Sequence, residues 1–584
     1  MRRTKIVCTL GPTSEEPEIL KAMLRAGMNV ARMNFSHGNH EEHARRIETV
    51  RQASRECKIP VAILLDTKGP EIRVRTFVNG QVTLVQGQIF TLTPQEVEGD
   101  ETRVAITYKQ LARDVKVGAR VLIDDGLIEM KVQEIKDGGD VICQVINGGV
   151  ISNRKSINLP GSPVSLPSMS EQDKADIIFG IEQKVDLIAA SFIRTANDVL
   201  AIRRLLEEHS ASIPIIAKIE NQQGLDNIDA ILKVADGLMV ARGDLGVEIP
   251  PEEVPLAQKD MIARCNRLGK PVITATQMLD SMIRNPRPTR AEATDVANAI
   301  FDGTDALMLS GETAMGKYPL EAVSTMARLA ERTEEALDCD SFLARHANIG
   351  RQSVTDALSY ACRQTSKQLG AAAIITSTES GHTARMVSKY RPLAPIIAVT
   401  PREDMLRRLL LTWGVFPLLG NKSENTDQMI HESITTSLNQ GLIKNGDLVV
   451  ITAGVPVGVP GTTNLLKVHV VGDVVVRGTG IGQKPAFGAV KVARNAKEAQ
   501  QLKPGSILVT TGLDSEMVQY LDGVVAIIAE EGGLTSHAAI VGLELGIPVI
   551  VGADGATSLL ADGQQVSIDT TRGLVYRGQA NIAG

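Results

Sequence analysis

Short runs of apolar, often β-branched residues recur along the first half of the chain, and segments with helical periodicity separate them. Eight runs lie between residues 5 and 313: KIVCTL, NVARMNF, VAILLDT, DLIAASF, IIAKIE, GLMVARGD, VITATQ and ALMLSGE, which start at Lys5, Asn29, Val61, Asp186, Ile215, Gly237, Val272 and Ala306. Continuous apolar strands that alternate with helices are typical of a parallel sheet covered on both faces. Eight such units predict an α/β fold, a (β/α)8 TIM barrel with functional residues at the carboxyl ends of its strands.

Polar residues stand at the ends of seven of these runs. They are Arg32, Asn34 and Ser36; Asp66 and Thr67; Ser191; Lys218 and Glu220; Arg242 and Asp244; Thr276 and Gln277; and Ser310 and Glu312. Strands selected only for packing would not end this way seven times. Two carboxylates and an ammonium group at one rim, from Lys218, Glu220 and Asp244, suit a divalent cation that holds an anionic, phosphorylated substrate.

The spacing of the runs predicts further domains. Residues 1–69 and 168–339 form the expected barrel, and the insert at residues 70–167 has alternating β patterns and turns such as FVNGQVTLVQGQIFTLT. We interpret the insert as a small β-barrel lid domain between hinges rich in Gly and Pro. Residues 340–473 again alternate strands with helices and predict an α/β regulatory domain, with strands AAIITST, PIIAVT, LVVITAG and LLKVHVV. Residues 474–584 are Gly-rich and β-like and predict a fourth module.

One loop of the predicted regulatory domain, TSTESGHT, is rich in hydroxyl groups and precedes a helical segment. Its candidate effector-binding residues are Thr376, Ser377, Thr378, Ser380, Gly381 and Thr383. Hydroxyls and free amides at a helix N-terminus can bind an anion. An ordinary N-cap loop explains the pattern equally well. Glu379 within the loop would oppose a doubly phosphorylated sugar.

Composition excludes several classes of function. The 584 residues are 43% hydrophobic and 22% charged, with a net charge of −6 and scattered lysines and arginines, so neither nucleic acid nor a membrane surface is an expected partner. The six cysteines form no CxxC pair, which favours a reducing compartment. Without an apolar run of roughly 18 residues or a secretory leader, a cytoplasmic location is expected. His37, His40 and His43 have a spacing that favours a solvated helix start over a metal cluster.

Six longer motifs closely resemble the pyruvate kinase family. They are RMNFSHG, LDTKGPEIR, AKIENQQG, MVARGDLGVEIP, ATQMLDSM and MLSGETAMGKYP, and the resemblance spans about residues 1–472 in the same order, lid included. It implies phosphoryl transfer from phosphoenolpyruvate to ADP, giving pyruvate and ATP, with a divalent and usually a monovalent cation. It also implies a homotetramer regulated through the third domain by a phosphorylated small-molecule effector, such as a sugar phosphate or a nucleoside monophosphate.

The resemblance assigns roles to individual residues. Glu220 and Asp244 are the implied Mg²⁺ (or Mn²⁺) ligands, and Lys218, Arg73 and Arg32 are the cations around the transferring phosphoryl group. Gly243 and Asp244 offer amides to the substrate carboxylate, and Thr276 belongs to the proton relay to the enolate, with water or Ser310 and Glu312 sharing that role. The implied K⁺ ligands are Asn34, Ser36, Asp66 and Thr67, and the implied nucleotide contacts are Asn34, His37, Arg73 and Lys155. Glu71 stands where K⁺-dependent members carry Glu, so K⁺ dependence is expected.

The last 110 or so residues resemble a different family. EEGGLTSHAAIVGLELGIPVIVG is similar to the swivelling phosphohistidine domain of phosphoenolpyruvate-utilising enzymes, in which His537 would carry phosphate with help from Thr535 and Ser536. Leu543 replaces the usual Arg of that family, and loss of a phosphate-pairing cation favours a structural or regulatory module over a working carrier.

Two other functions compete with phosphoryl transfer for the chain as a whole. One is a magnesium-dependent lyase or aldolase of the phosphoenolpyruvate/pyruvate barrel superfamily, which also holds magnesium with an acid pair. The other is a non-catalytic metabolite sensor. The lid and Lys218 favour phosphoryl transfer over the lyase, and the presence of every expected catalytic residue argues against the sensor.

Overall fold

A computed structural model describes residues 1–162, 164–345, 353–455 and 463–580. The chain divides into two compact units. The first comprises Met1–Arg351, Arg385–Arg391 and Arg402–Pro417, and the second comprises Gln352–Ala384, Pro392–Pro401 and Leu418–Gly584. The finer four-domain boundaries stay a prediction, and Pro163 of the second predicted hinge lies outside the described residues.

The first unit contains the predicted barrel. Its eight strands are β1 (Lys5–Thr9), β2 (Val30–Asn34), β3 (Ala62–Asp66), β13 (Leu187–Ala190), β14 (Ile215–Ile219), β15 (Gly237–Ala241), β16 (Val272–Ala275) and β17 (Ala306–Leu309). They close in this order, β17 pairs with β1, and every pairing is parallel. All eight apolar runs are therefore strands, and the predicted (β/α)8 fold is confirmed.

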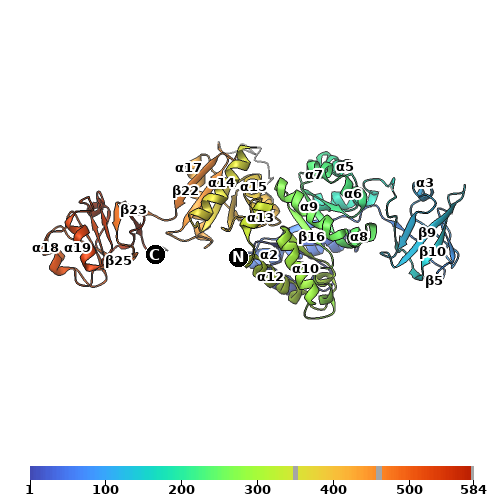
Figure 1. Ribbon diagram of the computed structural model, residues 1–584, viewed down its shortest axis with the longest axis horizontal. Helices are drawn as coiled ribbons and strands as arrows, with labels where there is room; N and C mark the ends of the chain where they lie inside the picture. Colours follow the sequence, from blue (N-terminus) through green and yellow to red (C-terminus); the bar gives the residue numbers. More distant parts are fainter. Residues whose placement is uncertain (163, 346–352, 456–462, 581–584) are drawn as a thin grey trace. The chain divides into compact units, whose positions relative to one another are not determined.

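Helices follow the strands and lie around the outside of the barrel (Figure 1). The principal ones are α1 (Pro17–Ala26), α2 (His40–Cys57), α4 (Glu171–Glu182), α5 (Ala196–Glu208), α7 (Ile228–Val234), α9 (Val254–Leu268), α10 (Arg290–Asp302) and α12 (Pro319–Glu335). Local sequence fixes their ends: Pro17 begins α1, Gly27 ends it with φ 116°, and Thr289 with Glu292 forms a capping box on α10. Alternate strand residues face two cores, because Ile6 packs with the helices whereas Val7 packs inside the barrel.

The interior of the barrel includes residues from a segment more than a hundred positions beyond its last strand. Leu410 and Leu411, which follow α16 (Glu403–Leu409), belong to the same buried cluster as Val7 and Ile273. Nearby, Asp305 accepts a hydrogen bond from Arg391 Nη1 at 3.0 Å, and the guanidinium lies 4.7 Å from the ring centroid of Trp413. A buried ion pair and an aromatic face therefore fasten this segment to the barrel.

The insert forms a curled sheet with its own core, in which every pairing is antiparallel except that of β6 with β7. Its strands are, in order across the sheet, β4 (Ile72–Arg73), β12 (Ser156–Asn158), β8 (Arg120–Ile123), β9 (Ile128–Ile135), β10 (Val141–Asn147), β6 (Ile89–Thr93) and β7 (Arg103–Ala105). The two edges meet through a bridge between Val74 and Ile106 and a hydrogen bond from Arg75 N to Ala105 O of 2.7 Å. Strands β5 (Gln81–Leu84) and β11 (Gly149–Ser152) add a ribbon. The meeting of the edges agrees with the predicted small β-barrel.

The predicted regulatory domain contains a five-stranded sheet. Its order is β20 (Val415–Leu419), β19 (Ile396–Thr400), β18 (Ala373–Ser377), β21 (Leu448–Ala453) and β22 (Leu465–Val470). Four of these strands match the predicted ones. Strand β20 was not predicted, because its sequence VFPLL contains Pro417, and proline generally argues against a strand. Proline is tolerated here because β20 lies at the edge of the sheet.

The C-terminal module contains an eight-stranded mixed sheet. Four of its strands are parallel neighbours: β25 (Ala486–Val492), β26 (Ser506–Thr510), β27 (Ala526–Ala529) and β28 (Val549–Val551). The others flank them antiparallel: β23 (Val474–Arg477), β24 (Thr479–Ile481), β29 (Gln565–Asp569) and β30 (Leu574–Arg577). Helix α19 (His537–Leu545) packs against β27 and β28.

In the described part of the chain, no helix combines the length and apolar character needed to cross a membrane.

The Asp305–Arg391 pair gives a stability prediction. We expect Asp305→Ala to lower the free energy of unfolding of the first unit by about 3–5 kcal/mol, because the Arg391 guanidinium stays buried without its carboxylate partner. Trp413, the single tryptophan of the chain, lies against that guanidinium and reports the transition by its fluorescence during urea unfolding.

The matched control is Asp280→Ala, which removes a surface pair with Arg284 and should cost less than about 1 kcal/mol. Equal urea midpoints for the two variants would contradict a stabilising role for the buried pair.

Candidate active site

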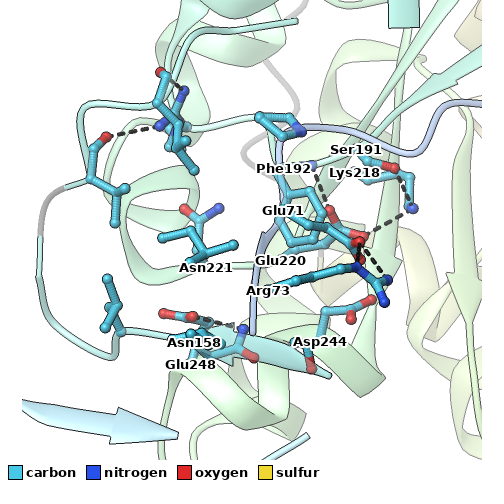
Figure 2. Close-up of a pocket in the computed structure, with 18 of the residues that line it drawn as sticks. Glu71, Arg73, Asn158, Ser191, Phe192, Lys218, Glu220, Asn221, Asp244 and Glu248 are labelled. Atoms are coloured by element: carbon cyan, nitrogen blue, oxygen red, sulfur yellow. Dashed lines mark hydrogen bonds and ion pairs between the residues drawn. The ribbon is translucent and has the colours of Figure 1, made fainter. Parts of the chain in front are cut away.

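A cavity of about 680 Å³ lies at the carboxyl ends of the barrel strands, and residues of the inserted sheet also line it (Figure 2). Its lining contains most of the predicted site residues: Arg32, Asn34, Ser36, His37, Glu71, Arg73, Lys155, Ser191, Lys218, Glu220 and Asp244. Asp66, Thr67 and Gly243 do not line the cavity but contact a lining residue or adjoin one in the chain, and Thr276 contacts Gly243. The topology therefore gathers most of the predicted site residues at one place.

The Lys218 ammonium lies at the centre of this arrangement. Nζ is 3.0 Å from Glu220 Oε1 and 3.1 Å from Asp66 Oδ1, and it donates a hydrogen bond of 2.7 Å to Ser191 Oγ. The residue is 8% exposed. Burial by itself would lower the pKa of Lys218, but the two carboxylates outweigh burial and raise it. The ammonium therefore stays charged at the floor of the cavity.

Asp66 joins Lys218 to Arg32. Its Oδ2 lies 2.5 Å from Arg32 Nε, and Arg32 Nη1 donates a bond of 2.8 Å to Thr9 Oγ1. Asp66 is fully buried, which would raise its pKa, but the charges of Arg32 and Lys218 hold the pKa below its usual value. Asp66 is thus an ionised carboxylate that holds both cations in place.

Glu220 and Asp244, the predicted metal ligands, have raised pKa values, in contrast to Asp66. Burial raises the pKa of Glu220 to about 7, and the neighbouring Asp244 adds to that rise while Lys218 opposes it. Burial likewise raises the pKa of Asp244. A divalent cation would stabilise the ionised forms of two carboxylates that resist ionisation together.

This donor set fits a metal that also binds substrate and water. In the described ranges no group of three or more His, Cys, Asp or Glu residues is placed to hold a metal ion. Two carboxylates leave other coordination positions for substrate oxygens and water, which is how Mg²⁺ is usually bound.

A strained residue, which sequence reasoning missed, orients Glu220. Phe192 has φ 55°, unusual for a bulky side chain, and its amide donates a bond of 2.5 Å to Glu220 Oε2. Gly69 lets the chain pass close by, because a Cβ there would lie 2.7 Å from the Phe192 ring and 2.8 Å from Ser191 Cβ. The ends of β3 and β13 therefore have to pack this closely to bring the Phe192 amide to Glu220.

Thr276 follows β16 and also has a left-handed backbone, with φ 65°. Its Oγ1 accepts a bond of 2.8 Å from the Gly243 amide and donates one of 2.6 Å to Ala275 O. The Gly243 amide, predicted to hold a substrate carboxylate, is therefore occupied by Thr276 in this structure. A substrate would have to compete with that bond.

The two residues suggested to share the proton relay with Thr276 lie apart from the cavity. Glu312 is 2% exposed, and its carboxylate accepts hydrogen bonds from Leu279 N at 3.0 Å and Ser310 N at 2.7 Å. Neither Glu312 nor Ser310 lines the cavity. Glu312 holds backbone in place here and has no direct path to a bound enolate.

The predicted K⁺ ligands lie at the ends of the neighbouring strands β2 and β3. Asn34 and Asp66 are register partners, and Asn34 Oδ1 accepts a bond of 3.2 Å from Ser36 N. Thr67 Oγ1 accepts a bond of 3.1 Å from Ser191 N. The four oxygen-bearing side chains are thus brought to one part of the rim, and one of them, Asp66, contacts Lys218.

The predicted nucleotide contacts from the inserted sheet are paired with carboxylates. Arg73 Nε lies 2.6 Å from Glu71 Oε2, and Lys155 Nζ lies 2.8 Å from Asp124 Oδ1. Both cations line the cavity. They can therefore reach an anionic ligand only by sharing or exchanging these partners.

The loop that carries His37 rests on two buried aromatic contacts. His43 is 2% exposed, stacks on Phe35 at 4.1 Å and donates through Nε2 to His37 O at 2.9 Å. His40 lies 2.7 Å from Asp176 Oδ1 and stacks on Phe179. The prediction of a solvated helix start is wrong for His43, because Phe35 and the turn before α2 cover it.

The candidate effector loop lies between β18 and a short helix that begins at His382. Thr378 Oγ1 accepts a bond of 2.9 Å from Gly381 N, and Thr383 Oγ1 lies 2.8 Å from Thr463 Oγ1. Of the other members, Ser377 and Ser380 are half-buried, whereas Thr376 is fully buried. These bonds suit an ordinary turn and leave both interpretations of the loop open.

His537 begins α19, with Ser536 as its N-cap. Its Nδ1 lies 2.8 Å from Leu513 O and so donates a hydrogen bond, which leaves Nε2 as the nitrogen with a lone pair. Thr535 and Leu543 are exposed. The phosphate-pairing cation that the sequence lacks at position 543 is thus replaced by an exposed apolar side chain.

Comparisons with known proteins place this geometry in a family. Residues 1–323 match the model of the pyruvate kinase barrel domain, residues 356–469 that of the pyruvate kinase alpha/beta domain, and residues 502–573 that of the mobile domain of PEP-utilising enzymes.

Three relatives named pyruvate kinase match the chain over its entire length. Those of Bacillus licheniformis and Geobacillus stearothermophilus are each 56% identical, over 585 and 584 residues, and that of Sporosarcina psychrophila is 54% identical over 586 residues. All of this chain and all of each relative are covered. The chain belongs to the pyruvate kinase family.

Proposed function

We propose that this chain transfers the phosphoryl group of phosphoenolpyruvate to ADP, yielding pyruvate and ATP. One observation supports this most: a buried ammonium group, Lys218, lies beside the carboxylate pair Glu220 and Asp244 at the floor of a cavity. Phosphoryl transfer requires charge placement more than covalent help from the protein. The family match removes the support for the lyase, aldolase and sensor alternatives.

Lys218 and Arg32 act on the substrate in this proposal. As phosphorus leaves the enolate oxygen, negative charge spreads over the transferring oxygens, and a fixed ammonium stabilises it without reorganisation. Asp66 contacts both cations and so keeps them aimed at the cavity. Arg73 adds a third cation from the inserted sheet, and with Asn34, His37 and Lys155 it would contact the nucleotide.

The proposed cofactors are Mg²⁺ (or Mn²⁺) and K⁺. Glu220 and Asp244 would hold the divalent cation, which when bound neutralises phosphate and enolate oxygens. Asn34, Ser36, Asp66 and Thr67 would hold K⁺. The second chemical step is protonation of the enolate at carbon, for which Thr276 would order the proton donor. The Gly243 and Asp244 amides would bind the substrate carboxylate.

Assembly, location and regulation extend the proposal. We expect a homotetramer in the cytoplasm, with a phosphorylated small-molecule effector at the loop from Thr376 to Thr383.

For the C-terminal module we favour a structural or regulatory role. Incubation with ³²P-labelled phosphoenolpyruvate should leave no acid-labile label on His537, and label that disappears in His537→Ala would establish the carrier instead.

Replacing Lys218 should slow the chemical step. We expect Lys218→Met to lower kcat by a factor on the order of 10³, as for loss of one charge-stabilising donor, in an assay that couples pyruvate to lactate dehydrogenase. Lys174→Met, which removes an exposed lysine paired with Glu171, is the control and should leave kcat unchanged. A loss of less than tenfold in Lys218→Met would exclude Lys218 from the role.

The raised pKa of Glu220 predicts how metal affinity depends on pH. A protonated carboxyl does not bind the metal. The affinity for Mn²⁺ without substrate should therefore reach its maximum well above pH 7, where Glu220 is ionised. It should fall as the pH drops through about 7, by up to about tenfold per pH unit.

Electron paramagnetic resonance of free Mn²⁺ measures this affinity. Glu220→Gln should bind Mn²⁺ weakly at every pH, and the exposed-site control Glu171→Gln should follow the wild type. An affinity that stays constant from pH 6 to 8 would be inconsistent with Glu220 as a ligand.

K⁺ dependence follows from Glu71. Activity in buffer free of Na⁺ and K⁺ should be a small fraction of that with K⁺, and Glu71→Lys should recover part of it, because the new ammonium group can replace the cation. Equal activity of the wild-type chain with and without K⁺ would refute the K⁺ proposal.

A further inference from the structure

The backbone at the end of β16 is held in a conformation that its residues do not favour. Thr276 and Gln277 have φ of 65° and 54°, and Thr276 is β-branched, for which the left-handed region is a genuine outlier. Such a conformation costs about 1–3 kcal/mol and persists only where the surroundings impose it. Something in the fold must therefore hold Thr276 in place.

The groups that hold it come from residues 242 and 243. Arg242 Nη2 donates to Thr276 O at 2.6 Å, and Arg242 Nε donates to Ala275 O at 3.2 Å. The next residue, Gly243, donates its amide to the Thr276 hydroxyl at 2.8 Å. Two consecutive residues at the end of β15 thus bind both carbonyls that flank the strained torsion and the hydroxyl itself.

Arg242 is in turn held from the opposite side. Its Nη1 lies 2.8 Å and 2.7 Å from the two carboxylate oxygens of Asp295 on α10. The Arg242 side chain is 11% exposed, and Arg242 does not line the cavity. It therefore has no route to contact a substrate bound there.

We propose that Arg242 is a positioning residue, which fixes the Thr276 hydroxyl for protonation of the enolate by binding the Ala275 and Thr276 carbonyls. The inference rests on the proposed function. A planar guanidinium suits the task, because it presents several N–H donors in fixed directions, whereas an ammonium group is a point charge. Asp244 lies two residues after Arg242, so the segment from Arg242 to Asp244 connects the proposed metal ligand to Thr276.

Exchange of the methyl protons of pyruvate tests this role apart from phosphoryl transfer. In D₂O the reverse of enolate protonation breaks a C3–H bond and passes the proton to solvent, and the forward step then returns a deuteron to carbon. The full chain with Mg²⁺, K⁺ and pyruvate is followed by NMR, and ATP formation from phosphoenolpyruvate is measured separately. Arg242→Lys should slow exchange by about 10- to 100-fold, as expected for a small misplacement of a reacting group.

The KM for phosphoenolpyruvate should change much less, because Arg242 does not touch the cavity. The matched control is Arg264→Lys, since Arg264 is also ion-paired, with Asp229 and Asp260, but lies on α9 with a more exposed side chain. It should exchange at the wild-type rate. If Arg242→Lys exchanges as fast as Arg264→Lys, the inference is wrong.

A double-mutant cycle shows whether Arg242 acts through Thr276. Added to Thr276→Ala, the substitution Arg242→Lys should have almost no further effect on exchange, because the group that it positions is already gone. Full additivity would overturn the inference and assign Arg242 a separate role. Thermal unfolding of each variant establishes that it is folded at the assay temperature.

If Arg242→Lys does not fold, Asp295→Asn decides the question. It keeps the bonds from Arg242 to the two carbonyls but weakens the support behind them, so exchange should fall at least a few-fold with KM unchanged. Wild-type exchange in that variant would contradict the inference. A wild-type protein that neither forms ATP nor exchanges pyruvate protons would instead refute the proposed function.

Discussion

The burial of one ammonium group among carboxylates is the constraint on which the site depends. Lys218 contacts Asp66 and Glu220 at the floor of the cavity, and burying such charges is costly unless each is paired. Arg32 and Lys218 supply two positive charges against three carboxylates, those of Asp66, Glu220 and Asp244. The cluster is therefore one cation short. Burial raises the pKa values of Glu220 and Asp244, and the missing positive charge makes the site suited to a divalent cation and the phosphate it would carry.

The barrel makes this cluster possible because parallel strands end on the same side. Asp66, Lys218 and the residues that contact them lie at four strand ends, those of β2, β3, β13 and β14, and range in the sequence from Arg32 to Glu220. Accurate placement also requires strain: Phe192 turns its amide to Glu220, and Thr276 turns its hydroxyl to Gly243. Such strain is characteristic of sites where the surrounding fold fixes the geometry of the reacting groups.

Much of the fold could be predicted because buried parallel strands leave a clear mark in the sequence. All eight barrel strands are apolar runs, and many of the polar residues that end them line one cavity, although Arg242, Ser310 and Glu312 do not. Edge strand β20 could not be predicted, since Pro417 signals against a strand unless its edge position is known. The roles of Phe192 and Arg242 and the burial of His43 were missed as well. Phe192 acts through a left-handed backbone torsion, and Arg242 acts through contacts with Thr276, which lies 34 positions further along the chain; no local pattern records either.

The central claim is that a divalent cation held by Glu220 and Asp244 faces a phosphoryl group bound by Lys218. A crystal structure of the chain with Mn²⁺ and phosphoenolpyruvate, with anomalous diffraction to locate the metal, tests it most directly. The account predicts one Mn²⁺ peak bonded to both carboxylates, with a phosphate oxygen within hydrogen-bonding distance of Lys218 Nζ. Mn²⁺ bound away from Glu220 and Asp244, or a phosphate that does not contact Lys218, would contradict it.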